Sequence, residues 1–185
     1  MCKKNTISTK NLVFCAFLAA LSVVMARVLC FATPDGVRWS LDKFPLFLAG
    51  MLFGPVLGGL TGFSADFLGS ILQFGFNPLL CPPAILYGVF GGLMSWFIRR
   101  KPSILRLGVS YLLPVALGSV LYQSAALSYF YFDGTFAAGY IYYLGTRSIQ
   151  FSIMLVVEVA IIYLLIKTKI FTRMGLWTSG KEEMQ

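Results

Sequence analysis

Charged residues divide this chain into four long apolar blocks, and this division is the strongest constraint on its fold. The blocks contain only three embedded charges, which are Arg27, Asp66 and Glu158, and they span residues 11–32, 44–98, 107–132 and 149–166. Only 12% of the residues are charged, whereas a soluble domain carries about 25%. Because so little polar surface cannot cover the chain in water, the pattern indicates an all-α integral membrane protein.

Composition also excludes several classes of function. A chain of 185 residues has room for one domain, 1–185, but not for an additional soluble nucleotide-binding domain. The net charge of +8 does not indicate nucleic-acid binding, since the cations lie between apolar spans. The chain lacks histidine, and its four cysteines form no CxxC pair. We therefore expect no metal site, no catalytic residues and no cofactor.

The basic clusters fix the number of membrane crossings. One helical crossing takes about 20 residues, so the blocks other than 44–98 each hold one crossing. Lysine and arginine gather on the cytoplasmic side of membranes, and three clusters belong there: Lys3, Lys4 and Lys10; Arg99, Arg100, Lys101 and Arg106; Lys167, Lys169 and Arg173. The block 44–98 then starts outside, ends inside and crosses three times. The sequence predicts six transmembrane helices with both termini cytoplasmic.

The expected helices cover residues 11–30, 44–59, 61–75, 79–98, 107–130 and 147–167. Glycines recur every four residues from Gly50 through Gly62, and Gly88 and Gly92 repeat this spacing. Small residues four apart allow helix backbones to approach closely in lipid. We expect the tight turn between the second and third helices to lie at Gly58–Gly59, and Pro55 to kink or end a helical turn before it.

Four cations fall on the outer side of this topology, namely Arg27, Arg38, Lys43 and Arg147. Arg38 and Lys43 have a simple explanation as snorkelling side chains or as ion partners of Asp35 and Asp42. Arg27 and Arg147 lie within apolar sequence, where a cation usually faces a cavity or a partner. Two such arginines could clamp a carboxylate, so they indicate an outward-facing pocket for an anionic ligand.

Aromatic and amide side chains accumulate in the same outer zone. Many of the rings suit an interfacial belt, and Phe44 and Phe76 are candidates for contacting a ligand. The amides of Asn77, Gln123 and Gln150 need hydrogen-bond partners near membrane depth, either from another helix or from a ligand. Two acids lie within apolar spans. Asp66 is expected to tie the glycine-rich helices together, and Glu158 either pairs with a cation or relays ions.

The stretch FPLFLAGMLFGPVLGGLTGFSADFLGSIL at residues 44–72 resembles the S components of energy-coupling factor (ECF) vitamin transporters. The following NPLLCPPAILYGVFGGLMS and the GTRSIQ segment at residues 145–150 are most similar to the folate-specific branch. The resemblance extends over nearly the whole chain. It implies a six-helix, multi-pass subunit of a bacterial plasma membrane that binds one vitamin with high affinity.

The resemblance also implies partners and residue roles. S components deliver their vitamin by docking on a transmembrane coupling protein with two ATPases, and ATP is hydrolysed by those partners. The docking face would be the small residues of the first helix, Ala16, Ala19 and Ala20. For folate, Arg27, Lys43 and Arg147 would meet the glutamate tail. Rings such as Phe44 and Phe76 would sandwich the pterin, and Asn77, Gln123 and Gln150 would read its edge.

Three other interpretations remain open. The chain could bind another vitamin, such as pantothenate, riboflavin or a B6-type compound, although several outer cations favour a more anionic ligand. It could be a structural membrane subunit without a ligand, which would leave Arg27 and Arg147 without a purpose. An intramembrane enzyme is disfavoured because the sequence has no histidine, no acidic metal motif and no Ser-Lys dyad in a span.

Overall fold

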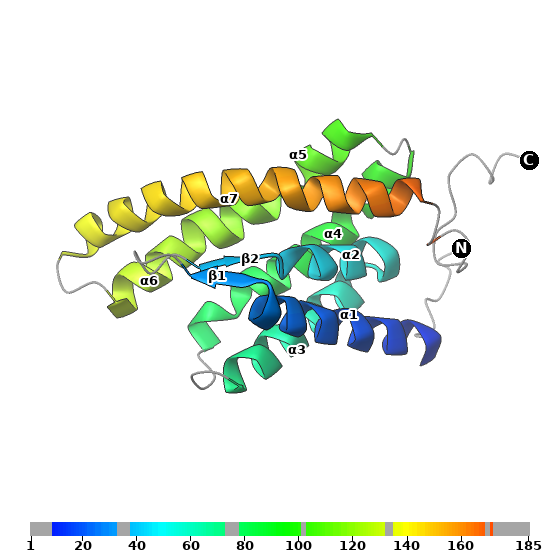
Figure 1. The fold of residues 1–185 in the computed structure, drawn as a ribbon, viewed down its shortest axis with the longest axis horizontal. Helices are drawn as coiled ribbons and strands as arrows, with labels where there is room; N and C mark the ends of the chain where they lie inside the picture. The colour runs from blue at the N-terminus through cyan, green and yellow to red at the C-terminus, as the bar shows by residue number, and fades with distance from the viewer. Residues whose placement is uncertain are drawn as a thin grey trace, which may run out of the picture.

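The described residues fold into a bundle of helices with a short β-hairpin (Figure 1). The computed structural model describes residues 9–32, 38–72, 78–100, 103–131, 135–168 and 171. Its elements are, in order, α1 (Thr9–Val28), β1 (Cys30–Ala32), β2 (Arg38–Ser40), α2 (Lys43–Phe53), α3 (Pro55–Ile71), the 3-10 turn η1 (Pro78–Leu80), α4 (Pro82–Arg100), α5 (Ile104–Pro114), the π-helical η2 (Val115–Tyr122), α6 (Gln123–Tyr131) and α7 (Phe136–Lys167).

The described helices form six rods, because α5, η2 and α6 follow one another without a break and count as one. Four helical stretches are long and apolar enough to cross a membrane, and they cover Thr9–Val28, Pro78–Ile98, Ile104–Phe130 and Phe136–Lys167. The start of α1 and the end of α7 lie at the same end of the bundle (Figure 1). The fold is therefore the all-α membrane bundle that the sequence predicts.

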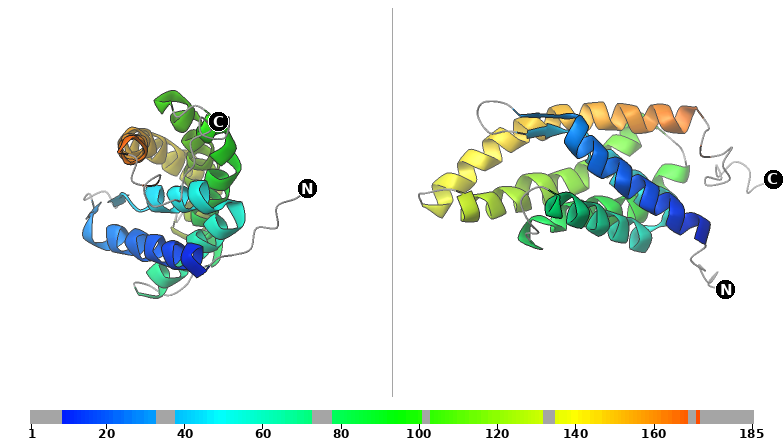
Figure 2. Two further views of the ribbon diagram at one scale, coloured as in Figure 1. Left: turned by 90° about the vertical axis from the view of Figure 1, so that its right-hand side faces the viewer. Right: turned by 60° about the horizontal axis from the view of Figure 1, so that its bottom comes forward.

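Helix α2 lies in the middle of the bundle (Figure 2, left). It packs against α1, α3, α4 and α7, and its nine residues from Phe44 to Leu52 are all buried. With 11 residues it is about 16 Å long, too short to span a hydrocarbon core of about 30 Å. Its role is to place its first turn, at Lys43, inside the bundle.

Glycines allow α2, α3 and α4 to pack with their backbones in contact. A Cβ atom on Gly50 would overlap the carbonyl of Gly88, and one on Gly88 would overlap the carbonyl of Gly58. The small-residue spacing therefore has the packing role that the sequence predicts.

The break between α2 and α3 lies at Gly54, so the expected turn at Gly58–Gly59 was wrong. Gly54 adopts a φ of 96°, a conformation that glycine accepts without steric cost. Pro55 then opens α3, where a missing backbone N–H has no consequence. Gly58 and Gly59 are buried within α3 and serve the contact with α4.

Two features were not anticipated. An antiparallel hairpin joins α1 to α2, with Phe31 opposite Trp39 in its register. Helix α7 begins at Phe136 rather than near residue 147 and has 32 residues, which corresponds to about 48 Å. As Figure 1 shows, α6 and the first half of α7 therefore extend beyond the hairpin at the end opposite to the start of α1.

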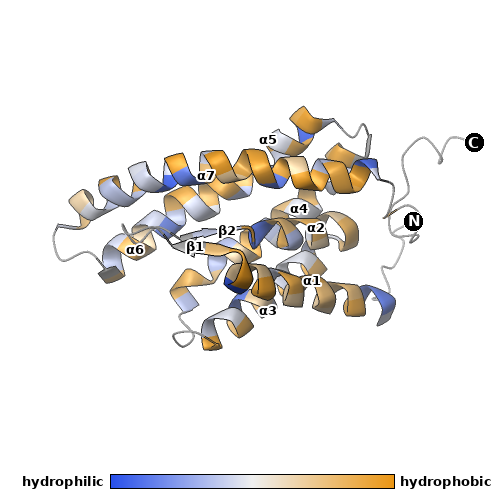
Figure 3. Ribbon diagram, in the orientation of Figure 1, coloured by the Kyte–Doolittle hydropathy of each residue, from blue (hydrophilic) through white to orange (hydrophobic). Residues whose placement is uncertain are grey.

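Hydrophobic residues make up most of each long helix (Figure 3). Large hydrophobic side chains are exposed on every long helix, for example Val13, Leu68, Trp96, Leu105 and Val156. Such surfaces require a hydrocarbon environment. Polar residues gather at helix ends, at the start of α2 and in the outer half of α7 (Figure 3).

Candidate ligand-binding site

Polar groups converge on the first turn of α2. The Lys43 ammonium pairs with Asp42 Oδ2 at 2.7 Å, and the Ser40 hydroxyl donates to Asp42 Oδ1 at 2.6 Å. The Ser22 hydroxyl of α1 donates to the backbone carbonyl of Asp42 at 2.7 Å. The hairpin and α1 thus hold the start of α2 in place. Both oxygens of the Asp42 carboxylate are occupied.

Two further carboxylates surround the same lysine. Asp66 of α3 and Glu158 of α7 both interact electrostatically with Lys43. The Cys81 thiol, just before α4, donates to the Asp66 carboxylate. Within the described part of the chain, Asp66 Oδ2 is buried and has no hydrogen-bond partner. Glu158 Oε1 is also buried, and the Glu158 carboxylate faces the backbone N–H of Lys43. The group has three carboxylates for one ammonium, so it has a surplus of hydrogen-bond acceptors.

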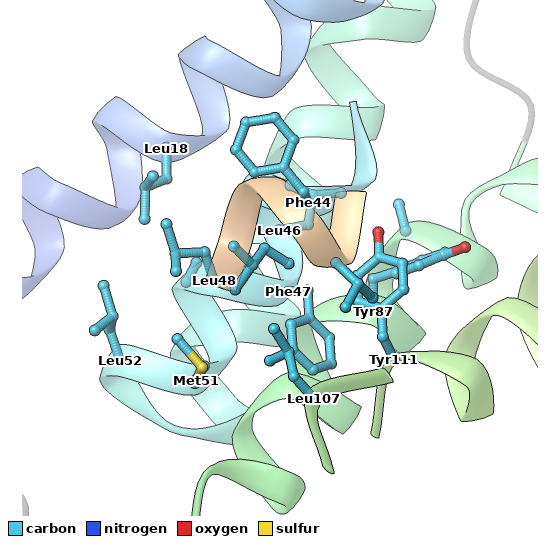
Figure 4. Packing of buried hydrophobic residues seen from close by; sticks show 14 of the residues in the cluster. Leu18, Phe44, Leu46, Phe47, Leu48, Met51, Leu52, Tyr87, Leu107 and Tyr111 are labelled. Atoms are coloured by element: carbon cyan, nitrogen blue, oxygen red, sulfur yellow. The ribbon is translucent and has the colours of Figure 1, made fainter. Parts of the chain in front are cut away.

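Glu158 is held from the other side by Tyr111, which packs against a second tyrosine, Tyr87. The Tyr111 hydroxyl donates to Glu158 Oε2 at 2.6 Å. The Tyr87 ring lies 5.5 Å from that of Tyr111, and its hydroxyl bonds to Ser119 at 2.9 Å. Figure 4 shows the two tyrosines side by side, with Phe47 against Tyr111. These contacts join α4, α5, η2 and α7 in the bundle interior.

A line of side chains along α7 connects this group to the outer end of the bundle. Positions 147, 150, 154 and 158 follow a spacing of three and four residues, which keeps them on one face of a helix. Gln150, Met154 and Glu158 are all buried. Arg147 lies about 16 Å from Glu158 along the axis, and its guanidinium lies 5.7 Å from the Phe151 ring centroid.

The two cations of the site, Arg147 and Lys43, differ in how many carboxylates lie near them. Arg147 forms no ion pair with any carboxylate of the described residues, and its electrostatic partners are the hydroxyls of Tyr143 and Tyr87. Lys43, in contrast, already has three carboxylates around it. Arg147 can therefore accept an anionic group, whereas the group around Lys43 has a surplus of acceptors. No described cluster of His, Cys, Asp and Glu could hold a metal ion.

The other site residues that the sequence predicts lie in different parts of the structure. Arg27 donates from its guanidinium to the carbonyl of Gly69, which ties the end of α1 to the end of α3. Phe44 is 5% exposed and packs in the core of the bundle (Figure 4). Gln123 begins α6, and its Oε1 is buried without a described partner. Phe76 and Asn77 lie outside the described residues.

The expected docking face on α1 is divided by the fold. Ala16 and Ala20 are exposed, as two residues four positions apart on one helix face can be. Ala19 is 4% exposed and belongs to the core, so its side chain is not available on the outer face.

Tyr87, Tyr111 and Ser119 were not identified from the sequence. A tyrosine in the middle of an apolar span needs a partner for its hydroxyl. This requirement, together with the acid at position 158, could have indicated a buried hydrogen bond. It could not have shown which helices contact one another.

The fold and the site together define a small helical membrane protein with buried polar groups inside an apolar bundle. The chain belongs to the family of ECF-type riboflavin transporter S components. The model of that family matches residues 6–172 of this chain. Membership places it among transporter subunits rather than enzymes.

Among proteins of known function, the chain is similar to the folate transporter FolT of Clostridium novyi (strain NT). The two are 33% identical over 116 residues, which is 60% of this chain. The chain matches 61% of that relative's length, or about three fifths.

Among solved structures, the chain is similar to the crystal structure of FolT bound with folic acid. The TM-score is 0.70 with 26% identity, and the match covers 85% of this chain and 94% of the other.

Proposed function

We propose that this chain is the folate-binding S component of an ECF-type vitamin importer in a bacterial plasma membrane. It takes folate from the extracellular side and delivers it by docking on a transmembrane coupling protein with two ATPases. Those partners hydrolyse the ATP. The similarity to FolT, in sequence and in fold, supports folate as the ligand.

The observation that carries the choice of ligand is the state of Arg147. Its guanidinium lies over Phe151 without a described carboxylate partner, and a cation at membrane depth needs a counter-charge. Folate provides two carboxylates on its glutamate tail. A guanidinium binds a carboxylate through two parallel hydrogen bonds, so Arg147 is our candidate for the tail.

Riboflavin is the second candidate, because the family to which the chain belongs is that of riboflavin transporter S components. Riboflavin carries no carboxylate and would leave Arg147 without a counter-charge. Pantothenate would supply one carboxylate but no aromatic ring for the tyrosines and phenylalanines of the outer end. Folate supplies both a carboxylate for Arg147 and an aromatic ring for these side chains.

Membranes from cells that express the chain without its partners provide a direct test. We expect them to retain radiolabelled folate in the absence of ATP, and unlabelled folate to displace it. Riboflavin and pantothenate should not displace it. Vesicles that also contain the coupling protein and ATPases should accumulate folate only when ATP is supplied. Displacement by riboflavin, or retention no greater than in membranes lacking the chain, would contradict the proposal.

A further inference from the structure

The densest run of positive charge in the chain lies at the junction of α4 and α5. Arg99 and Arg100 end α4, Lys101 follows them, and Arg106 is in the first turn of α5. No aspartate or glutamate occurs from the start of α4 to the end of α6. The cations therefore have no acidic neighbour along this part of the chain, and the junction is strongly positive.

The side chain of Arg106 is held in place by an aromatic ring. Its guanidinium lies 5.1 Å from the centroid of the Phe97 ring, which is 38% exposed. Among the residues that the structure describes, no carboxylate forms an ion pair with Arg106. A cation–π contact orients a guanidinium without supplying an acceptor for its N–H groups. Those donors match the geometry of a phosphate group.

Exposed apolar side chains continue from this junction toward the middle of the bundle. On α5 they are Leu105, Val109 and Leu112, which are 77%, 62% and 52% exposed and share one helix face through their spacing of four and three residues. On α4, which packs against α5, Leu93 and Trp96 are 57% and 62% exposed. We call these five residues the α4–α5 flank. It is an apolar surface with a cluster of cations at one end.

We propose that the α4–α5 flank binds an anionic phospholipid. The phosphate lies against Arg106, and Arg99, Arg100 and Lys101 add positive charge at the headgroup. The acyl chains lie along the apolar residues of the flank. Basic residues at the cytoplasmic ends of transmembrane helices attract anionic headgroups, and the start of α5 lies at the end of the bundle that the basic clusters predict to be cytoplasmic (Figure 1).

The position of the flank favours a lipid over the coupling protein as its occupant. Helices α5 and α1 lie on opposite sides of the bundle (Figures 1 and 2), so the flank faces away from the docking face that we expect at Ala16 and Ala20. The apolar part of the flank also lies within a surface that requires hydrocarbon. This inference is independent of which vitamin the chain binds.

Native mass spectrometry of the full chain, purified in detergent and depleted of lipid, measures the preference directly. Dioleoyl-phosphatidylglycerol and dioleoyl-phosphatidylcholine have the same acyl chains but differ in net charge. We expect the chain to retain phosphatidylglycerol in preference to phosphatidylcholine. Arg106→Gln should weaken the affinity for phosphatidylglycerol by about five-fold, the contribution of one cation near anionic headgroups. Its affinity for phosphatidylcholine should not change.

Lys167→Gln is the matched control, because it removes one positive charge at the same end of the bundle, from the end of α7. It should retain the wild-type affinity for phosphatidylglycerol. Should Arg106→Gln fail to give a monodisperse sample, Phe97→Leu keeps the charge but removes the ring, and we expect about a two- to five-fold loss.

Three results would overturn the inference. The first is equal retention of the two lipids by the wild-type chain. The second is an equal loss in Lys167→Gln and Arg106→Gln, which would show diffuse attraction rather than a site. The third is displacement of phosphatidylglycerol by an equal concentration of glycerol phosphate, which would show that the site takes a soluble phosphate. If Arg106→Gln kept its lipid affinity but lost co-purification of the coupling protein, the cations would belong to that partner instead.

Discussion

The hydroxyl of Tyr111 donates a 2.6 Å hydrogen bond to Glu158 Oε2, and the two side chains are 0% and 1% exposed. This contact joins α5 to α7 in the interior of the bundle. Because Glu158 also acts on Lys43 at the start of α2, the hydrogen bond links three helices to the base of the candidate site.

Removing the Tyr111 hydroxyl should destabilise the bundle. In Tyr111→Phe, a buried carboxylate oxygen loses its donor, which costs about 1–3 kcal/mol. We expect a lower thermal unfolding midpoint in detergent, and folate should restore part of the loss by mass action. Tyr129→Phe, at a side chain that is 74% exposed, is the control and should leave the midpoint unchanged. Equal midpoints for the two variants would contradict this role for the hydrogen bond.

The contact between α3 and α4 should not tolerate a single added methyl group at Gly88. Its Cβ atom would overlap the carbonyl of Gly58 and the neighbouring Gly59 nitrogen, both of which are backbone, and overpacking typically costs about 1–3 kcal/mol or more. We expect Gly88→Ala to yield little monodisperse protein on size exclusion. Gly108→Ala should behave like the wild type, because nothing lies within 4 Å of the added atom. Normal yield of both variants would show that the helices can separate at little cost.

Arg147 should contribute to the affinity for the tail of the ligand rather than for its ring. We expect Arg147→Gln to weaken folate binding by about 10- to 100-fold, the effect of losing a charge-assisted hydrogen bond, while the affinity for 6-methylpterin stays the same. Arg106→Gln is the control, because Arg106 likewise lies over an aromatic ring, at 5.1 Å from that of Phe97. Equal losses for folate and 6-methylpterin would argue against a contact with the tail.

Bulk on the exposed face of α1 should affect assembly but not ligand binding. Close helix packing in lipid depends on small residues, so the double substitution Ala16→Leu and Ala20→Leu should reduce co-purification of the coupling protein. Folate affinity of the lone chain should be retained. Ala138→Leu adds the same bulk to an exposed position of α7 and should leave co-purification intact. If the double variant still captures the coupling protein fully, docking uses another face.

Much of the fold could be predicted from the sequence, because charge clusters and apolar length determine how often a chain crosses a membrane. The position of the break at Gly54 could not, since Gly58–Gly59 looks equally suited to a turn. The deciding fact is that Gly58 is needed for the contact with Gly88 of α4. The hairpin was missed because its strands have three residues each, too few to show an alternating pattern. The early start of α7 was missed because Arg147 was taken as the boundary of the last apolar block.

The site could be predicted only in part. Arg147 and Gln150 share one face of α7, and the sequence predicted each of them from its residue type in the outer zone. Lys43 was expected to meet the ligand, but its pairing with Asp42 and its neighbours Asp66 and Glu158 depend on three helices meeting. No sequence pattern within one segment predicts which helices will contact one another. The roles of the expected site residues as ligand contacts stay predictions.

Titration calorimetry of folate into the purified chain, without partners or ATP, tests the central claim most directly. We predict saturable binding of one folate per chain with a Kd below about 1 μM, and no comparable heat with riboflavin or pantothenate. Tight binding of riboflavin instead, or the absence of saturable folate binding by a monodisperse sample, would contradict the account.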